Sequence, residues 1–295
     1  MVSAMKVKTR KARFSPLTII MFVVLTVYSI LLIALLGYAL ITALKRPMDF
    51  SDNQVGLPDP WYFKNFSYIL KNAQIKKAQG VVNFGRIIWN SIYYSVGCAL
   101  VNTVVLFAVA YVCARYKCKF SKIIYSTVLI VMVIPIVGNQ TSELQVSIAL
   151  GLYDKMIGML VMRASFLGIY FLIFYDIFDS IPMAYSEAAE IDGAGDMQIM
   201  LKIFFPMTVN TFLTIFLISF IGYWNNYQVP MVYVPNSPTL SEYMFSITTN
   251  ESQGDFVFPP VQLAAALMLL LPVVAIFVIF SNKLLGNLSV GGVKG

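Results

Sequence analysis

The sequence predicts an all-α integral membrane protein with about six transmembrane helices. Of its 295 residues 59% are hydrophobic and only 12% are charged, and the apolar residues gather in long runs. A soluble domain of this length needs far more charge on its surface, so much of this surface is expected to face lipid. Because a bilayer core takes about 20 residues of helix, the long apolar runs are the predicted spans.

Six such runs follow one another along the chain. They cover residues 17–44, 87–114, 123–138, 156–178, 207–228 and 259–282. Pro135 and Pro272 lie inside the third and sixth runs, where neighbouring helices can satisfy the backbone groups that proline frees. Arg163 interrupts the fourth run near its outer end, where its side chain is expected to snorkel to the membrane surface.

Basic residues set the predicted orientation. Five precede the first run, between Lys6 and Arg13, and four more lie in the tight loop at 115–122. Cytoplasmic segments carry an excess of Lys and Arg, so both segments and, with six spans, the C-terminus are predicted to be cytoplasmic. The loop at 45–86 is predicted to be external, and its seven basic residues fit this rule poorly. The chain divides into a basic cytoplasmic N-terminus at 1–15, a first transmembrane helix at 16–44, an external loop at 45–86, a five-helix core at 87–282 and a cytoplasmic tail at 283–295.

The composition argues against several classes of function. The chain has no histidine, which excludes histidine metal ligands, general bases and proton relays. Cys98, Cys113 and Cys118 lack the spacing of a zinc site, and there is no P-loop for a nucleotide phosphate. The net charge of +7 is spread between apolar runs, so no nucleic acid partner is expected. We therefore expect no enzyme activity, metal or cofactor in this chain.

The segment between the fourth and fifth runs predicts two short helices joined by a turn. Pro182 can begin the first helix, and Gly193 can end it because glycine accepts a positive φ. Asp196 is expected to N-cap a second helix that reaches about Phe205, and Pro206 is expected to separate that helix from the fifth span.

This segment is unusually acidic for a cytoplasmic loop. Residues 176–202 contain six acidic residues and one basic residue. Ala188 and Ala189 would permit close approach of another surface, and Glu187 and Glu190 could meet basic groups on it. An ordinary amphipathic connector with a solvated acidic face explains the same pattern, so the residues alone leave both interpretations open.

The spacing within this segment resembles the signature of permeases in binding-protein-dependent ABC importers. That signature is Glu-Ala-Ala, three residues, Gly, nine residues, Ile, one residue, Leu-Pro. The only departure is Phe205, which stands where the family has leucine. The Asp192-Gly193-Ala194 triplet and the C-terminal Gly291–Gly295 segment further resemble the carbohydrate (maltose-type) branch, in particular the shorter of its two permease subunits. The matching residues are Glu187, Ala188, Ala189, Gly193, Ile203 and Pro206.

The resemblance implies a role for the segment and a set of partners. It implies a coupling helix that docks on a separate ATPase subunit, with Glu187 paired to a basic group and Gly193 making the sharp turn. It implies partners in a second homologous permease, two ATP-binding cassette subunits that bind ATP and Mg, an external substrate-binding protein, a carbohydrate and membrane lipid. The core at 87–282 would be a permease core in the inner or plasma membrane of a prokaryote, forming half of a sugar pathway. The tail residues implied to contact the ATPase are Gly291, Gly292, Val293 and Lys294.

Polar and aromatic residues at the ends of the third and fifth runs are candidates for lining this pathway. Sugars bind by stacking on aromatic rings and by hydrogen bonds to side-chain amides. Hydrogen bonds between helices and aromatic residues at the membrane interface explain the same residues equally simply. The candidates are Asn139, Gln140, Tyr223, Trp224, Asn225 and Asn226.

Three other functions were weighed against a sugar permease. The first is an ABC permease for another solute, such as a phosphorylated polyol, a peptide or an amino acid. The second is an ion-coupled secondary transporter, which would need carboxylates or histidines deep in the membrane. The only carboxylate within a run is Asp176, near the cytoplasmic end of the fourth. The third is a membrane assembly protein with no role in transport.

Overall fold

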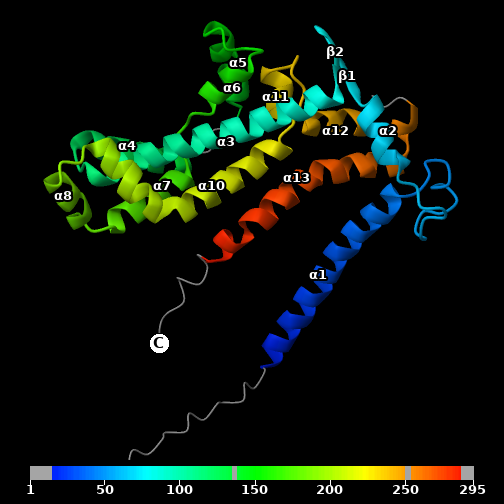
Figure 1. Cartoon of the computed structure of the whole chain (residues 1–295), viewed down its shortest axis with the longest axis horizontal. Helices are drawn as coiled ribbons and strands as arrows, with labels where there is room; N and C mark the ends of the chain where they lie inside the picture. The colour runs from blue at the N-terminus through cyan, green and yellow to red at the C-terminus, as the bar shows by residue number, and fades with distance from the viewer. Residues whose placement is uncertain (1–14, 135–137, 250–253, 287–295) are drawn as a thin grey trace, which may run out of the picture.

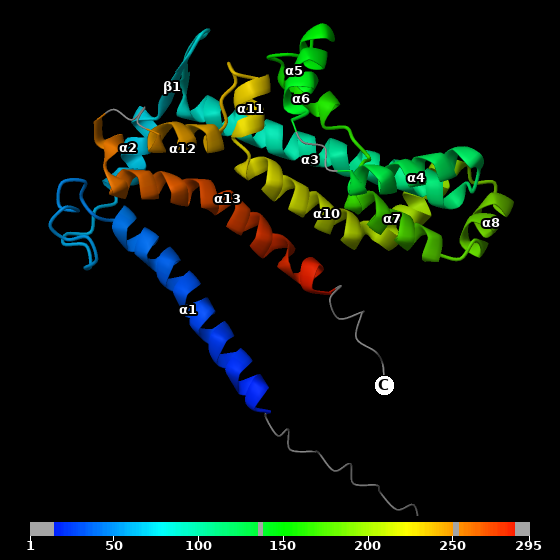
Figure 2. The same cartoon turned by 180° about the vertical axis from the view of Figure 1, so that it is seen from behind.

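The computed structural model of the chain describes residues 15–134, 138–249 and 254–286. Its body is an elongated bundle in which α3 (Phe84–Arg115) and α10 (Phe205–Asn225) pack along each other in opposite directions (Figure 1). α13 (Pro259–Gly286) packs on α10. The C-terminal end of α1 (Pro16–Ala43) contacts α13, and the rest of α1 points away from the bundle (Figures 1 and 2). The predicted all-α class is confirmed, since one short hairpin is the only sheet in the described ranges.

Four helices are long and apolar enough to cross a membrane: α1, α3, the continuous helix Asp196–Asn225 and α13. The third predicted span is the shorter α4 (Lys119–Val133), whose 15 residues extend roughly 22 Å. Pro272 lies inside α13 as predicted. Pro135 falls outside the described residues.

The fourth predicted span is not one helix, which corrects the prediction for residues 156–178. The chain forms α6 (Met156–Met162), leaves helical geometry, and resumes as α7 (Ile169–Ser180). Gly168 begins α7 with a φ of 137°, a conformation that strongly favours glycine. The Nδ2 of Asn102 on α3 donates to the carbonyl oxygens of Arg163 and Ser165, at 3.3 and 2.9 Å, and so holds the break against the bundle.

One end of the bundle, called here the hairpin end, carries a group of short elements. The predicted loop at 45–86 forms α2 (Lys64–Asn72) and an antiparallel hairpin that runs directly into α3 at Phe84. Asn83 caps α3 by accepting a hydrogen bond from the backbone N–H of Arg86. The other short elements at this end are β1 (Gln74–Lys77), β2 (Gly80–Asn83), α11 (Gln228–Tyr233), α12 (Leu240–Thr248) and η2 (Gly254–Val257). Between the two ends, α5 (Gln140–Ala149) projects beside α6 (Figure 1).

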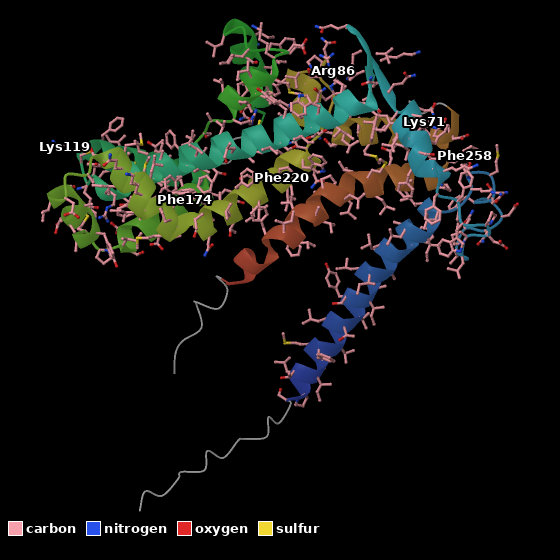
Figure 3. All side chains as sticks on the ribbon, in the orientation of Figure 1. Lys71, Arg86, Lys119, Phe174, Phe220 and Phe258 are labelled. Atoms are coloured by element: carbon pink, nitrogen blue, oxygen red, sulfur yellow. The ribbon has the colours of Figure 1, made fainter. Side chains whose placement is uncertain are left out.

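The opposite end, called here the α8 end, carries α8 (Ala184–Ile191), the C-termini of α3 and α7, and the start of α4 (Figures 1 and 2). An aromatic core joins these elements to α10. The ring of Phe107 makes edge-to-face contacts of 5.1 to 5.8 Å with four phenylalanine rings, among them Phe174 (Figure 3). A second core cluster at the hairpin end contains Phe220 and packs α3, α10, α12 and α13 together. Aromatic pairs of this geometry stabilise packing beyond their buried area.

Candidate functional site

The acidic segment forms the tip of the α8 end. α8 begins at Ala184 and ends in a Schellman motif. The N–H of Gly193 donates to the carbonyl oxygen of Glu190 at 3.0 Å, and the N–H of Ala194 donates to that of Ala189 at 2.9 Å. Gly193 has a φ of 79°, so glycine meets a real backbone requirement at the position where the sequence predicted the turn.

The chain beyond the turn differs from the prediction. Gly195 is the N-cap of α9 (Asp196–Ile199) and Asp196 is its first helical residue. α9 continues through the π-helical turn η1 (Met200–Phe204) directly into α10, so Pro206 does not separate two helices. A proline ring clashes with the carbonyl four residues before it in an α-helix, and the wider π-turn just before Pro206 relieves that clash. The motif proline therefore sits in the first turn of α10.

The six motif residues divide between the surface and the interior. Glu187, Ala188, Gly193 and Pro206 are exposed, whereas Ala189 packs inward and Ile203 is half-buried in η1. The outer face of α8 also carries apolar side chains, because Ile191 is 86% exposed and Tyr185 is half-exposed. An exposed apolar patch beside a carboxylate on a short helix is typical of a surface that binds another protein. The predicted tail contacts, Gly291, Gly292, Val293 and Lys294, lie outside the described residues.

The attachment of α8 to the bundle was not predicted from the sequence. Arg115, assigned from the sequence only to a basic loop, is the last residue of α3 and donates to the Oγ of Ser186 on α8 at 2.8 Å. The next residue, Tyr116, shares a side-chain hydrogen bond with Asp196, which raises the pKa of the tyrosine. A basic residue at the end of an apolar run is also what the orientation rule predicts, so no sequence signal marks this contact.

Most of the pathway candidates in the fifth run form hydrogen bonds within this chain. The Nε1 of Trp224 donates to the carbonyl oxygen of Leu269 on α13 at 2.9 Å, and Trp224 is only 3% exposed. Asn225 is exposed and donates back to its own helix, and Asn226 accepts from the backbone N–H of Val229. Trp224 thus makes a helix–helix hydrogen bond, the simpler of the two interpretations of that residue.

The third-run candidates belong to a polar cluster around Glu143 on α5. Asn139 donates to Glu143 Oε1 at 2.8 Å, and the hydroxyl of Tyr233 donates to Glu143 Oε2 at 3.1 Å. The Nη2 of Arg163 lies 3.1 Å from the same Oε2, so Arg163 is paired within the protein, and its snorkelling to the membrane surface stays a prediction. The backbone oxygen of Gln140 accepts from Tyr233 as well.

Tyr223 connects the two groups of candidates. It packs in the cluster that contains Tyr233 and contacts the ring of Tyr94 edge-on at 5.8 Å. The side-chain hydrogen bonds of Asn225 and Asn226 are made with Ile221 and Val229, away from the polar cluster around Glu143. Across the same ranges no three His, Cys, Asp or Glu side chains converge where they could hold a metal ion.

Comparison with known proteins places this arrangement in a family. The chain is 25% identical over 274 residues to the diacetylchitobiose uptake system permease protein of Streptomyces coelicolor, covering 90% of this chain and 86% of that protein. It is 27% identical to the melibiose/raffinose/stachyose import permease protein of Bacillus subtilis, covering 87% and 89%. The crystal structure of a bacterial ABC transporter involved in the import of the acidic polysaccharide alginate has a chain of the same fold, with a TM-score of 0.79, 19% identity, and coverage of 92% of this chain and 99% of that one.

The match to a family covers more than half of the chain and includes the whole α8 segment. Residues 106–284 match the binding-protein-dependent transport system inner membrane component. The sequence resemblance and the match therefore rest on the same region of the molecule. The chain belongs to the family of binding-protein-dependent transport system inner membrane components.

Proposed function

We propose that this chain is the membrane-spanning permease subunit of an ABC importer for a sugar or oligosaccharide. The observation that carries the proposal is the exposed face of α8, which presents Glu187, Ala188 and Ile191 at the tip of the bundle in a chain of this family. The related permeases named for diacetylchitobiose, for melibiose, raffinose and stachyose, and for trehalose support a sugar as the cargo.

In this proposal α8 docks on a separate ATPase subunit that binds ATP and Mg, and this chain hydrolyses nothing itself. The Glu187 carboxylate would pair with a basic group of that subunit, and Ala188 would let the two surfaces approach closely. α8 leads back to α7 on one side and through α9 and η1 to α10 on the other. A displacement of α8 would therefore move two helices of the bundle as a rigid body, which is how a packed contact transmits coupling free energy.

The remaining partners follow from the two ends of the bundle. The α8 end would be cytoplasmic, together with both termini, and the hairpin end would face an external substrate-binding protein. A second homologous permease would complete the pathway, and a second ATPase subunit would dock on that partner. Lys117, Lys119 and Lys122 lie at the α8 end, which supports this orientation in the cell membrane of a prokaryote (Lys119 in Figure 3).

Charge reversal at Glu187 tests the docking role. In the complete transporter reconstituted in liposomes, Glu187→Lys should lower ATP hydrolysis stimulated by the binding protein by about tenfold or more, while the permease still inserts and assembles. Glu187→Asp, which keeps a carboxylate at this position, is the matched control and should retain more of the stimulation. Unchanged stimulation in Glu187→Lys would refute the docking role and favour an assembly protein.

Uptake assays test the cargo. Liposomes carrying the transporter and its binding protein should accumulate a labelled oligosaccharide only when ATP is supplied to the ATPase side. Accumulation of a peptide, an amino acid or a phosphorylated polyol with no uptake of sugars would retain the ABC mechanism and overturn the sugar assignment. Accumulation driven by an ion gradient without ATP would instead indicate a secondary transporter.

A further inference from the structure

The guanidinium of Arg115 lies where four elements of the α8 end meet. Arg115 is the last residue of α3 and is only 8% exposed. Its Nη1 donates to the carbonyl oxygens of Ile181 at 2.9 Å and Phe178 at 3.4 Å, at the C-terminus of α7. Its Nη2 donates to Ser186 on α8, and its Cζ lies 4.6 Å from the centre of the Phe204 ring in η1. One side chain thus joins α3, α7, α8 and η1.

The contacts also explain how a buried positive charge is tolerated here. No carboxylate in the described ranges forms an ion pair with Arg115. The carbonyl oxygens at the end of α7 carry the partial negative charge of a helix C-terminus and are favourable partners for a cation. The face of the Phe204 ring adds a cation–π contact. Three hydrogen bonds in different directions and a flat ring contact require a planar fork of donors, which lysine lacks.

A second contact from the same end of α3 holds the other side of the Gly193 turn. Tyr116 follows Arg115 and shares a hydrogen bond with Asp196, the first residue of α9. The phenol of Tyr116 donates to the Asp196 carboxylate, and this hydrogen bond raises the pKa of Tyr116. The end of α3 therefore holds both short helices that flank the turn, although neither is adjacent to α3 in sequence.

We propose that Arg115 is a positioning residue that fixes α8 to α3, α7 and η1, so that a displacement of α8 moves these elements together. The inference rests on the proposed function, since it needs an ATPase subunit that displaces α8. Glu187 and the outer face of α8 would still be presented without the guanidinium, so docking and basal ATP hydrolysis would persist. The displacement would be taken up by local movement of α8, and substrate moved per ATP hydrolysed would fall.

Two pairs of variants test this role in the complete transporter. Arg115→Gln removes the fork and the charge, and its control is Lys119→Gln, which removes an exposed positive charge at the start of α4 (Figure 3). Ser186→Ala removes only the bond to α8, and its control is Ser180→Ala, whose hydroxyl donates only to Ile177 of its own helix. Arg115→Lys keeps the charge and loses the fork, so it should not restore coupling.

Two measurements are made on each variant. A spin label at Met183→Cys, in a Cys118→Ser background, reports the mobility of α8, because Met183 is the exposed N-cap of α8 outside the proposed docking face and the other two cysteines are buried. Substrate transported per ATP hydrolysed reports coupling. Arg115→Gln and Arg115→Lys should raise label mobility and lower this ratio by about fivefold or more, Ser186→Ala should do both to a smaller extent, and the controls should match wild type.

The outcomes separate this inference from the proposed function. Wild-type mobility, or a wild-type transport ratio, in Arg115→Gln overturns the role of Arg115. If that variant does not assemble, equal behaviour of Ser186→Ala and Ser180→Ala overturns it instead. If the Arg115 variants behave like wild type while Glu187→Lys lowers stimulated ATP hydrolysis, only the positioning role is refuted. An ineffective Glu187→Lys refutes the docking function whatever the Arg115 variants do.

Discussion

The hairpin end and the α8 end of the bundle are fastened in different ways. At the hairpin end, polar side chains bridge segments that are far apart in the sequence. Lys77 in β1 forms an ion pair with the buried Glu242 in α12. The backbone N–H of Leu240 donates to the Oγ of Ser91 on α3 at 2.6 Å, and Asn90 donates to a backbone carbonyl just before α12.

The α8 end has an aromatic core and few polar bridges. Its exposed ion pair, between Lys117 and Asp179 at 2.7 Å, is of a kind that contributes little to stability. Arg115 alone carries three of the polar contacts that join its elements, and the outer face of α8 has no partner within the chain's described residues.

This difference predicts that the hairpin end mainly affects the stability of the protein and the α8 end mainly affects coupling. Many buried polar contacts make the hairpin end a unit that should resist local change, and losing one partner of such a contact is costly. The α8 end leaves the outer face of α8, the proposed docking surface, exposed, and a few residues attach α8 to the bundle. Substitutions at the hairpin end should therefore lower stability, and substitutions at the α8 end should lower coupling with smaller changes in stability.

The largest expected effect on stability is that of Lys77→Met at the hairpin end. The change leaves the buried Glu242 carboxylate without this cation and should destabilise the protein by about 3 kcal/mol. The thermal midpoint, followed by tryptophan fluorescence in lipid nanodiscs, should fall by about 6 °C. Lys76→Met, an exposed lysine on the neighbouring position of the same strand, is the control. Equal midpoints for the two variants would mean that the pair does not fasten this end.

A smaller effect is expected at the Gly193 turn. A β-branched residue is strained at a φ of 79°, so Gly193→Val should cost about 2 kcal/mol locally even though no atom lies within 4 Å of the added Cβ. Because α8 carries the proposed docking surface, stimulated ATP hydrolysis should fall by about tenfold or more while the thermal midpoint changes by only a few degrees. Gly193→Asn, which tolerates positive φ better, should retain more of the stimulation. A midpoint loss larger than that of Lys77→Met would contradict the contrast between the ends.

A change of about 1 kcal/mol is expected for Ser91→Ala, which leaves the buried N–H of Leu240 without its acceptor. The thermal midpoint should fall by about 2 °C with transport per ATP unchanged. Ser246→Ala is the control, because that hydroxyl donates only within its own helix. A loss of coupling in Ser91→Ala, without a loss of stability, would show that the hairpin end also transmits the displacement of α8.

Local physics explains which features could be predicted from the sequence. Long apolar runs and a glycine at the end of a short acidic helix need no knowledge of distant residues, and α1, α3, α13 and the Gly193 turn were predicted near their observed bounds. The break in the fourth run was missed because it depends on Asn102 from another helix. The continuous helix through Pro206 was missed because a π-turn offsets the clash that ends most helices at proline.

The polar contacts that join the elements at each end connect residues that are far apart in the sequence. Lys77 and Glu242 are 165 residues apart, and Arg115 and Ser186 are 71 residues apart. From the sequence alone, Lys77, Glu242 and Arg115 are each explained as charged residues of a loop. Exposed motif residues such as Glu187 could be identified because their spacing is local, whereas the residues that hold them could not.

The smallest effect concerns the accessibility of the α8 end, reported by Cys118 at the start of α4. Its thiol is exposed, whereas Cys98 and Cys113 are buried. The hydrogen bond between its side chain and that of Ser121 lowers the pKa of Cys118 below its usual value. At a pH below the ordinary thiol pKa of about 8.5, more thiolate is therefore present in the folded protein than in the unfolded chain, and alkylation is faster.

The dependence of the alkylation rate on pH should accordingly have its midpoint below that of an unstructured cysteine peptide, and Ser121→Ala should move the midpoint upward. Labelling should disappear in Cys118→Ser, because the two buried thiols do not react. A membrane-impermeant reagent should label Cys118 from the same side of the membrane on which Glu187 docks the ATPase, since both lie at the α8 end. Labelling only from the opposite side would place the two ends of the bundle in the reverse orientation, and would leave the hairpin end facing the ATPase.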